Sequence, residues 1–344
     1  MRFLTAFFCI QDGYSVLLTG SKRMKERPIK PLVDALNSIG AAIHYKEKEG
    51  FPPLLIEGKN LIKDKLVIDA SISSQYISAL LLIAPKLTNG LSIYTKNKIV
   101  SSPYIDMTIR LLGKAGIEVS HKNNDFTVSH QQFKNTAFTI ESDWSSASYW
   151  YEYLALAHST NLNIILKGLK KDSLQGDSIL PELYKVFGIK TSFIEEGIII
   201  KKLPHFTQQT FIEMNLENTP DLAQTIVCTG AGLNLEMIIS GLSTLTIKET
   251  NRLKALKEEL LKFGVTSEII NNNTFILHKG NRIKTPNQSI ATYNDHRMAM
   301  AFAPLQKVVG SFNIENPEVV IKSYPDYWTE MRKLESYSNE CNII

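Results

Sequence analysis

Apolar and polar residues along the chain follow a pattern that occurs four times. Each copy begins with apolar residues at helical spacing, passes through a glycine and continues as an alternating strand. The four segments are LVDALNSIGAAIHY, TIRLLGKAGIEVSH, ELYKVFGIKTSF and LKEELLKFGVTSEI. Their glycines, Gly40, Gly116, Gly188 and Gly264, are 76, 72 and 76 residues apart. Each glycine lies where a helix end needs a left-handed residue, so the pattern predicts a repeated helix followed by two strands.

A second set of positions has nearly the same period. Polar clusters at Ser74, Ser146, Asp221 and Asp295 are 72, 75 and 74 residues apart, and each opens an apolar segment that predicts a buried helix. Counting back 72 residues from Ser74 leads to Arg2, which is followed by the apolar run FLTAFF. The chain is therefore expected to begin part-way into such a unit, at the start of its helix.

A period of about 74 residues holding two helices and four strands predicts βαβαββ units rather than a solenoid. We expect an α/β fold of two lobes. The lower lobe would span residues 1–141, with about two units and a first unit that is largely missing. The upper lobe would span residues 142–344, with about three units. Where buried helices begin at one face, their dipoles make that face electropositive, which suits phosphate and carboxylate ligands.

Composition narrows the class of protein. The chain has 344 residues, 44% of them hydrophobic, which is enough for two sizeable cores, and no apolar run approaches the length of a membrane span. The first residues lack the features of a signal peptide. Three cysteines form neither a metal spacing nor a disulfide framework, as expected in a reducing cytoplasm. A net charge of +4 without a dense basic run argues against a nucleic-acid binder and favours small anionic ligands.

Three N-terminal segments place polar side chains at predicted helix starts. In DASISSQYISALLL, Ser73, Ser74 and Gln75 either form a phosphate cradle with backbone N–H groups or serve only as caps. Ser101 and Tyr104 in IVSSPYIDMTIRLL repeat this arrangement, with a tyrosine that can hydrogen-bond or stack on a ligand. The basic segment TGSKRMKERPIK is either a solvated helix start or presents one inward guanidinium to an anion.

The second half of the chain carries the other candidates. Lys248, Glu249 and Arg252 fall within one predicted helical turn, where two cations four residues apart repel each other unless they share an anion. Asp221 in NTPDLAQT is a favoured helix cap, and among cations its carboxylate would stay charged and accept a proton. Lys322 ends a strand-like run before a proline-containing helix start.

The segment SIATYNDHRMAMAF has two interpretations. Asn294 or Asp295 caps the apolar helix that follows, and the remaining polar residues belong to the surface. Alternatively, the segment is an anion site in which Arg297 supplies the positive charge. The shared period of the helix starts favours the second interpretation.

Six motifs, RMKERP, SSQY, SSPYID, TPDLAQT, KETNR and above all YNDHRMAM, resemble those of the 5-enolpyruvylshikimate-3-phosphate (EPSP) synthase family, in the family's order along essentially the whole chain. The resemblance implies the enolpyruvyl transferase fold of the inside-out barrel type, with helix N-termini directed at the cleft between two lobes. It implies transfer of the enolpyruvyl group of phosphoenolpyruvate to the 5-hydroxyl of shikimate 3-phosphate, with release of phosphate through a tetrahedral intermediate, in chorismate and aromatic amino-acid biosynthesis. It further implies no metal or organic cofactor, a monomer and a cytoplasmic location.

The resemblance also implies a role for each matching residue. The ligands of shikimate 3-phosphate would be Ser73, Ser74, Gln75, Ser101, Tyr104, Asp221 and Lys248. The ligands of phosphoenolpyruvate would be Arg23, Gln75, Arg252, Arg297 and Lys322. Three residues would be catalytic. Asp221 would be the base on the attacking hydroxyl, with Lys248 beside it. Glu249 would take part in proton transfer at the methylene carbon.

The chain departs from the family pattern in places. The family's early Lys-Ser pair, a nearby Arg and an Asn-x-Gly-Thr turn are absent, Asn251 replaces an acid in KETNR, and Thr244 stands where some members have Asn. We therefore expect a truncated synthase with weak or no activity. One alternative is a non-catalytic phosphate-binding relative. The other is a UDP-N-acetylglucosamine enolpyruvyl transferase, although that family usually needs a reactive loop cysteine, and Cys9, Cys228 and Cys341 lie in apolar stretches or the tail.

Overall fold

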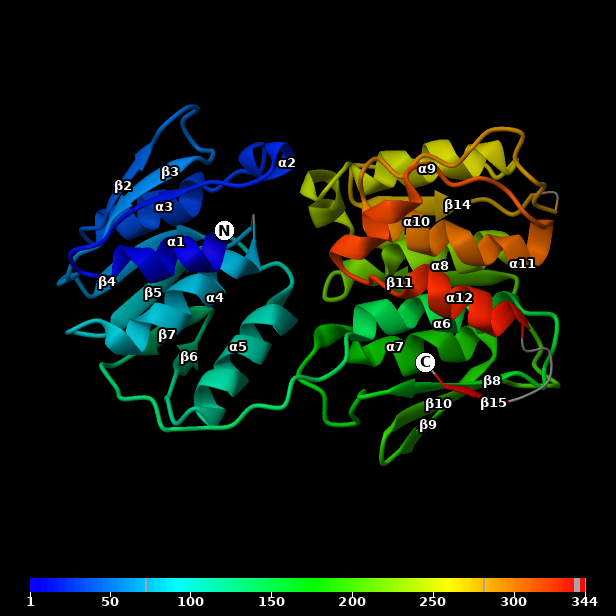
Figure 1. Ribbon diagram of the computed structural model, residues 1–344, viewed down its shortest axis with the longest axis horizontal. Helices are drawn as coiled ribbons and strands as arrows, with labels where there is room; N and C mark the ends of the chain where they lie inside the picture. The colour runs from blue at the N-terminus through cyan, green and yellow to red at the C-terminus, as the bar shows by residue number, and fades with distance from the viewer. Residues whose placement is uncertain (72, 281, 337–340, 344) are drawn as a thin grey trace. The chain divides into compact units, whose positions relative to one another are not determined.

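The computed structural model describes residues 1–71, 73–280, 282–336 and 341–343. It divides into two compact units, which we call lobe 1 (Met1–Thr139) and lobe 2 (Ile140–Ile344). Each lobe combines small sheets with helices (Figure 1), as the predicted α/β class requires. Among the described residues, no helix is both long enough and apolar enough to cross a membrane.

Lobe 1 is built from short helices packed on two sheets. Its helices are α1 (Arg2–Cys9), α2 (Lys22–Lys25), α3 (Lys30–Ser38), α4 (Ser74–Ile83), the 3-10 turn η1 (Ala84–Lys86) and α5 (Ser102–Lys114). One sheet has the order β1–β3–β2, with strands β1 (Ser15–Leu18), β2 (Ala42–Tyr45) and β3 (Leu54–Glu57). The other has the order β4–β5–β7–β6, with strands β4 (Lys65–Asp69), β5 (Leu91–Lys96), β6 (Ser120–Lys122) and β7 (Asp125–Val128).

Lobe 2 carries two further sheets. One has the order β15–β8–β10–β9, with strands β8 (Asn163–Lys167), β9 (Ile189–Ile194), β10 (Gly197–Lys202) and β15 (Cys341–Ile343). The other has the order β11–β12–β14–β13, with strands β11 (Phe211–Asn215), β12 (Glu236–Ser240), β13 (Ser267–Ile270) and β14 (Thr274–Leu277). Its α-helices are α6 (Trp144–Leu156), α7 (Leu180–Leu183), α8 (Ala223–Gly232), α9 (Arg252–Lys262), α10 (His296–Phe302), α11 (Gln306–Val309) and α12 (Tyr327–Ser336). Its 3-10 turns are η2 (Gly176–Ile179), η3 (Tyr184–Phe187), η4 (Pro220–Leu222), η5 (Ser243–Ile247), η6 (Ala303–Leu305) and η7 (Pro317–Lys322).

The sheets share one topology. In each four-stranded sheet the first pair is parallel, namely β4 with β5, β11 with β12 and β15 with β8, and the remaining pairs are antiparallel. The sheet β1–β3–β2 contains the same antiparallel pairs. The βαβαββ unit predicted from the period is therefore present, for example as β4, α4, β5, α5, β6 and β7.

The repeated glycines have the predicted conformation. The φ angles of Gly40, Gly116, Gly188 and Gly264 are 106°, 81°, 74° and 79°, respectively. A residue with a Cβ is strained in this left-handed region, so glycine is favoured where the chain leaves the helix and turns into a strand.

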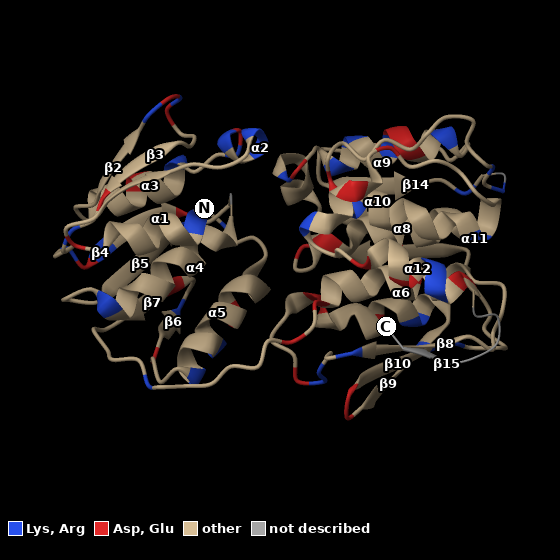
Figure 2. Cartoon of the chain, viewed as in Figure 1, with Lys and Arg blue, Asp and Glu red and all other residues tan. Residues whose placement is uncertain are grey.

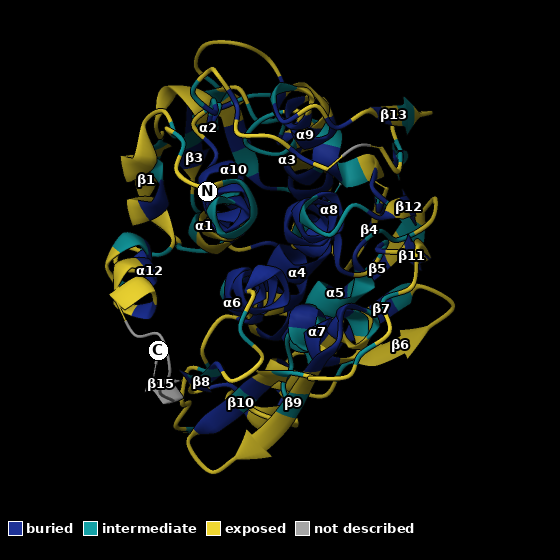
Figure 3. Ribbon diagram, turned by 90° about the vertical axis from the view of Figure 1, so that its right-hand side faces the viewer, coloured by how far each residue is buried: buried dark blue, intermediate teal, exposed yellow. Residues whose placement is uncertain are grey.

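The helices that the second set of positions predicts form the cores. Helix α4 contacts α1 in lobe 1, and α6, α8 and α10 contact one another in lobe 2. Helices α4, α6, α8 and α10 are buried along nearly their whole length, as the dark ribbons of α4, α6 and α8 show in Figure 3, whereas α1 exposes Phe3, Leu4 and Phe7 on one side. The polar residues therefore occur where each buried helix begins, and the apolar remainder fills the core.

Candidate active site

Arg252, the first residue of α9, is the most enclosed charge among the predicted ligands. Asn251 caps α9 by accepting a hydrogen bond from the backbone N–H of Lys254, so the unusual residue of KETNR has a structural role here. The side chain of Arg252 is 2% exposed. Its Nε and Nη2 donate to the two carboxylate oxygens of Asp295 at 2.7 and 3.3 Å. This two-point geometry fixes the plane of the guanidinium.

The same guanidinium reaches two further carboxylates. Arg252 Nη1 donates to Asp221 Oδ1 at 2.9 Å, and Nη2 donates to Glu249 Oε2 at 3.0 Å. The Lys322 ammonium approaches the other oxygen of Glu249 at 3.3 Å. One arginine thus links three acids that lie far apart in the sequence, which only the folded lobe can bring together.

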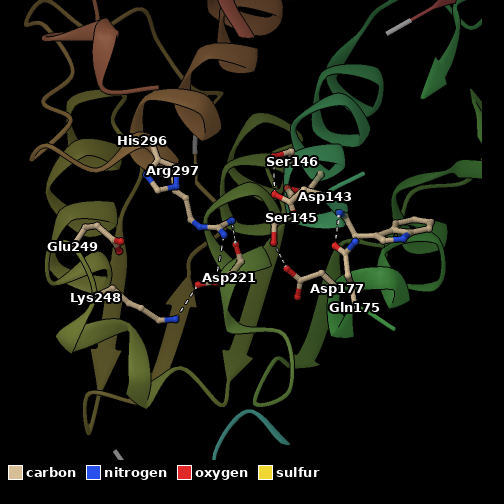
Figure 4. Close-up of polar contacts among 12 residues, drawn as sticks. Asp143, Ser145, Ser146, Gln175, Asp177, Asp221, Lys248, Glu249, His296 and Arg297 are labelled. Atoms are coloured by element: carbon tan, nitrogen blue, oxygen red, sulfur yellow. Dashed lines mark hydrogen bonds and ion pairs between the residues drawn. The ribbon is translucent and has the colours of Figure 1, made fainter. Parts of the chain in front are cut away.

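Three cations contact the Asp221 carboxylate. Lys248 Nζ lies 3.2 Å from Asp221 Oδ1, next to Arg252, and Arg297 Nη2 lies 3.3 Å from Oδ2. Figure 4 shows Lys248 and Arg297 approaching this carboxylate from different elements. Burial alone would raise the pKa of Asp221, but the positive charges of Arg297, Lys248 and Arg252 hold it well below its ordinary value. Asp221 is therefore ionised at neutral pH, as the sequence predicts.

We call this group the Asp221 cluster; it comprises Asp221, Lys248, Glu249, Arg252, Asp295, Arg297 and Lys322. Four cations face three carboxylates, so the cluster exceeds neutrality by one positive charge. Figure 2 shows both signs of charge near the starts of α9 and α10. The cluster is less positive than expected from its cations alone, because the carboxylates already engage them.

Two details of the predicted site are wrong. Lys248 was expected on one helical face with Arg252, but it precedes α9 as the extended residue that follows η5. The anion that the two cations share is the protein's own Asp221. Lys322 was expected after a strand-like run, but it ends the 3-10 turn η7, which begins at Pro317. Proline lacks an N–H and fixes φ, and both properties favour a first helical turn over a paired strand.

The capping interpretation of SIATYNDHRMAMAF is confirmed for Asp295, but the expectation that the other polar residues belong to the surface is wrong, because His296 is buried and the Arg297 side chain is 13% exposed. Binding of a ligand anion by this segment stays a prediction. Asp295 caps α10 by accepting from the backbone N–H of Arg297 at 3.0 Å, while Arg297 reaches Asp221 with its guanidinium. The neighbouring His296 is buried, and burial followed by the charge of Arg297 lowers its pKa to about 4. His296 is consequently neutral at physiological pH, so it adds no charge to the cluster.

The start of α6 adds acidic groups that the sequence analysis did not assign to the site. Asp143 caps α6 by accepting from the backbone N–H of Ser145 at 3.0 Å and also accepts from the Ser146 hydroxyl at 2.8 Å. The Ser145 hydroxyl donates to Asp177, as Figure 4 shows. Burial, and then the negative charge of Asp221, raises the pKa of Asp177 to about 6. Asp177 gave no signal in the sequence, because its burial depends on how η2 packs against α6.

Replacing Asp177 by asparagine is expected to stabilise the protein at pH 8 but not at pH 4. The folded pKa lies above the ordinary value, so this carboxyl favours folding when protonated, and that contribution is lost as the pH rises through about 6. The gain at pH 8 should be roughly 1–3 kcal/mol, seen as a higher melting temperature. Asp172→Asn, a control at an exposed position, should leave the melting temperature unchanged at both pH values. Equal shifts of the Asp177 variant at both pH values would contradict this assignment.

In lobe 1, the predicted ligands lie at the starts of α4 and α5, which pack against each other. Ser73 is the N-cap residue of α4, Ser74 is buried, and Gln75 Oε1 accepts from Arg2 at 2.5 Å. Ser101 is the N-cap residue of α5 with a left-handed φ of 53°. The contacts thus bring the SSQ motif close to the helix that begins with the SSPY motif.

The other two predicted residues of lobe 1 lie on α5 and α2. Tyr104 belongs to the first turn of α5, where its carbonyl oxygen accepts from Thr108 Oγ1 at 2.9 Å. Arg23 belongs to the short helix α2, where its Nη1 lies 3.2 Å from Glu26 Oε2 on the surface. The predicted ligands therefore form one set within lobe 1 and another within lobe 2.

Cys9 and Cys228 have the properties of core residues. Cys9 and Cys228 are fully buried. Burial raises the pKa of the Cys9 thiol to about 12 and that of Cys228 well above its ordinary value. A nucleophilic cysteine needs a thiolate that the substrate can reach, so neither residue fits that role.

Comparisons with known proteins converge on one family. The sequence profile described as EPSP synthase (3-phosphoshikimate 1-carboxyvinyltransferase) matches residues 1–331. A protein of Bacteroides fragilis named 3-phosphoshikimate 1-carboxyvinyltransferase is 43% identical over 335 residues, covering 97% of this chain and 80% of that protein. One of the same name from Haemophilus influenzae is 37% identical over 342 residues, covering 97% and 76%, respectively. The solved EPSP synthase of Acinetobacter baumannii superposes with a TM-score of 0.70 at 21% identity, over 95% of this chain and 75% of that one.

Proposed function

The chain belongs to the EPSP synthase family of 3-phosphoshikimate 1-carboxyvinyltransferases, enzymes of the shikimate pathway, and from this premise we propose that the Asp221 cluster and the serine-rich helix starts of lobe 1 carry its reaction. The enolpyruvyl group of phosphoenolpyruvate passes to the 5-hydroxyl of shikimate 3-phosphate, and phosphate is released. The observation that supports these assignments most strongly is the Asp221 carboxylate, only 14% exposed, in contact with Lys248, Arg252 and Arg297.

Cations of the Asp221 cluster bind phosphoenolpyruvate in this proposal. Arg297 and Lys322 are partly accessible, with side chains 13% and 59% exposed, whereas Arg252 is enclosed by carboxylates. Arg297 and Lys322 are therefore the first contacts of the phosphate and carboxylate, and Arg252 joins as the substrate displaces Glu249 or Asp221 from it. Arg23 and Gln75 complete the phosphoenolpyruvate ligands.

Shikimate 3-phosphate is bound by residues of both sets. Its phosphate is held by the hydroxyls and backbone N–H groups at the helix starts, from Ser73, Ser74 and Ser101. Gln75 and Tyr104 contribute further hydrogen bonds. Asp221 and Lys248 bind the hydroxyl groups of the ring.

The chemistry is an addition followed by an elimination. Asp221 accepts the proton of the 5-hydroxyl while that oxygen bonds to the substituted carbon of phosphoenolpyruvate, and the methylene carbon gains a proton through Glu249. The tetrahedral intermediate then loses a proton from the new methyl group and expels phosphate. Substrate anions that draw Arg252 and Arg297 away from Asp221 weaken the charges that hold its pKa low, which makes it a better base when both substrates are bound. Arginine and lysine charges stabilise the intermediate.

Four further properties belong to the proposal. No metal or organic cofactor takes part in this reaction, and the protein is a monomer of the cytoplasm. The domain organisation is a lower lobe of residues 1–141 with about two βαβαββ units and an upper lobe of residues 142–344 with about three.

Release of inorganic phosphate from phosphoenolpyruvate tests the proposed function. Release should require shikimate 3-phosphate, and UDP-N-acetylglucosamine should not replace it as the acceptor. Release that depends on UDP-N-acetylglucosamine would contradict the proposal in favour of the related sugar transferase. Binding of shikimate 3-phosphate without any release would identify a non-catalytic relative instead.

A further inference from the structure

Residues 289–293, which lead into α10, form hydrogen bonds with side chains of α9. Lys262 Nζ donates to the carbonyl oxygen of Ser289 at 2.9 Å. Glu259 Oε2 accepts from the backbone N–H of Ala291 at 2.9 Å, and Glu259 Oε1 accepts from the Tyr293 hydroxyl at 2.8 Å. Residues 289–293 therefore follow the surface of α9 before the chain turns into α10.

The segment needs this support because its backbone is unfavourable just before α10. Tyr293 and Asn294 both have left-handed backbones, with φ of 53° and 56°. Asparagine tolerates this region, but a tyrosine in it is strained and persists only where its surroundings hold it. The Tyr293 hydroxyl, which has a single proton to donate, lies 2.8 Å from Glu259 and 2.9 Å from Glu258, so its far end lies between two carboxylates of α9.

Glu259 is well placed to act on the Asp221 cluster. It lies seven residues after Arg252, which is two helical turns along the same face of α9. Glu259 is 1% exposed and pairs with Lys262 Nζ at 2.7 Å. Arg252 donates a hydrogen bond to Asp295. Glu259 accepts hydrogen bonds from Ala291 and Tyr293, which lie four and two residues before Asp295. One helix face thus fixes both the start of α10 and the approach to it.

We propose that Glu259 and the Tyr293 hydroxyl form a clamp that positions Arg297 for substrate binding. Arg297 is the second residue of α10 and reaches Asp221 at 3.3 Å, so a small shift in where α10 begins moves its guanidinium. Neither clamp residue contacts a predicted ligand residue directly in the contacts described, and both act through the backbone of 291–296. This inference rests on the proposed function, in which Arg297 binds phosphoenolpyruvate.

Tyr293→Phe tests the clamp, because it removes only the hydroxyl and keeps the ring. Calorimetric titration with phosphoenolpyruvate alone, without acceptor and thus without turnover, should give an affinity about 3–10-fold weaker than that of the wild type. In an Arg297→Lys background the same change should cost less than twofold, because the residue being positioned is already altered. Glu259→Gln, whose amide has one acceptor oxygen for two donors that meet different oxygens of Glu259, should weaken the affinity about as much as Tyr293→Phe.

Tyr151→Phe is the matched control. It removes a hydroxyl bonded to Thr191 at 2.7 Å, between α6 and β9, and should leave the affinity unchanged. Amide hydrogen exchange at residues 291–297 should be faster in Tyr293→Phe than in either the wild type or Tyr151→Phe. Unchanged affinity of Tyr293→Phe, or an equal loss in both Arg297 backgrounds, would overturn the clamp. A wild type that binds no phosphoenolpyruvate would contradict the proposed function instead, and hydrogen exchange would then decide the clamp alone.

Discussion

Arg252→Ala is expected to lower the free energy of unfolding by about 3–5 kcal/mol. The substitution leaves Asp295 without the guanidinium that bonds both of its oxygens, and it leaves Asp221 and Glu249 with fewer cations in a buried site. A buried carboxylate gives up its bound water on folding, and without the arginine no other group compensates for that cost. The loss of unfolding free energy is therefore larger than for a surface ion pair.

Thermal and urea unfolding measure this effect. For a lobe of this size, a loss of 3–5 kcal/mol corresponds to a fall in melting temperature of roughly 10 °C. Arg252→Lys should lie between the wild type and Arg252→Ala, because lysine keeps the charge but not the two-point geometry. Arg332→Ala, at an exposed arginine of α12, should stay within about 0.5 kcal/mol of the wild type. A melting temperature of Arg252→Ala within about 2 °C of the wild type would show that the carboxylates do not depend on Arg252.

Asp221→Asn is expected to reduce turnover by about 10²–10⁴-fold. Asparagine keeps the shape of the side chain but neither accepts the hydroxyl proton nor carries charge. The Michaelis constant for phosphoenolpyruvate should not rise, because the lost carboxylate is one that competes with this substrate for Arg252 and Arg297. A large fall in kcat without a weaker substrate interaction distinguishes a base from a binding residue.

Steady-state phosphate release with both substrates measures kcat and the Michaelis constant separately. Asp172→Asn serves as a surface control. Melting curves of each variant separate chemical loss from unfolding, since Asp221→Asn removes the negative charge that three cations of the cluster contact. Unchanged kcat in Asp221→Asn would remove Asp221 as the base. A raised Michaelis constant with unchanged kcat would make it a binding residue only.

The sequence predicts features that depend on local structure. The spacing of Gly40, Gly116, Gly188 and Gly264 reflects helix ends that need positive φ, and each glycine has it. The polar residues that open each apolar run mark helix starts, because unpaired N–H groups there need acceptors whatever the rest of the fold does. The α/β class, the repeated unit and the family were accessible for these reasons.

The ion-pair partners of the charged residues could not be predicted from local sequence features. Lys248, Arg252 and Asp221 were identifiable as candidates from the sequence, but their convergence depends on how η4, η5 and α9 pack together. Asp295 was expected only as a cap, whereas it also neutralises Arg252. Asp177 was missed, because an isolated acid in the sequence carries no sign that it will be buried beside another carboxylate.

The crystallographic position of phosphoenolpyruvate, soaked into the chain without acceptor, tests the central claim that the Asp221 cluster is its binding site. The account predicts ligand oxygens at hydrogen-bond distance, about 2.7–3.2 Å, from Arg297 and Lys322, with Asp221 losing at least one of its cation contacts. Density for the ligand elsewhere, with every contact of the cluster intact, would contradict it.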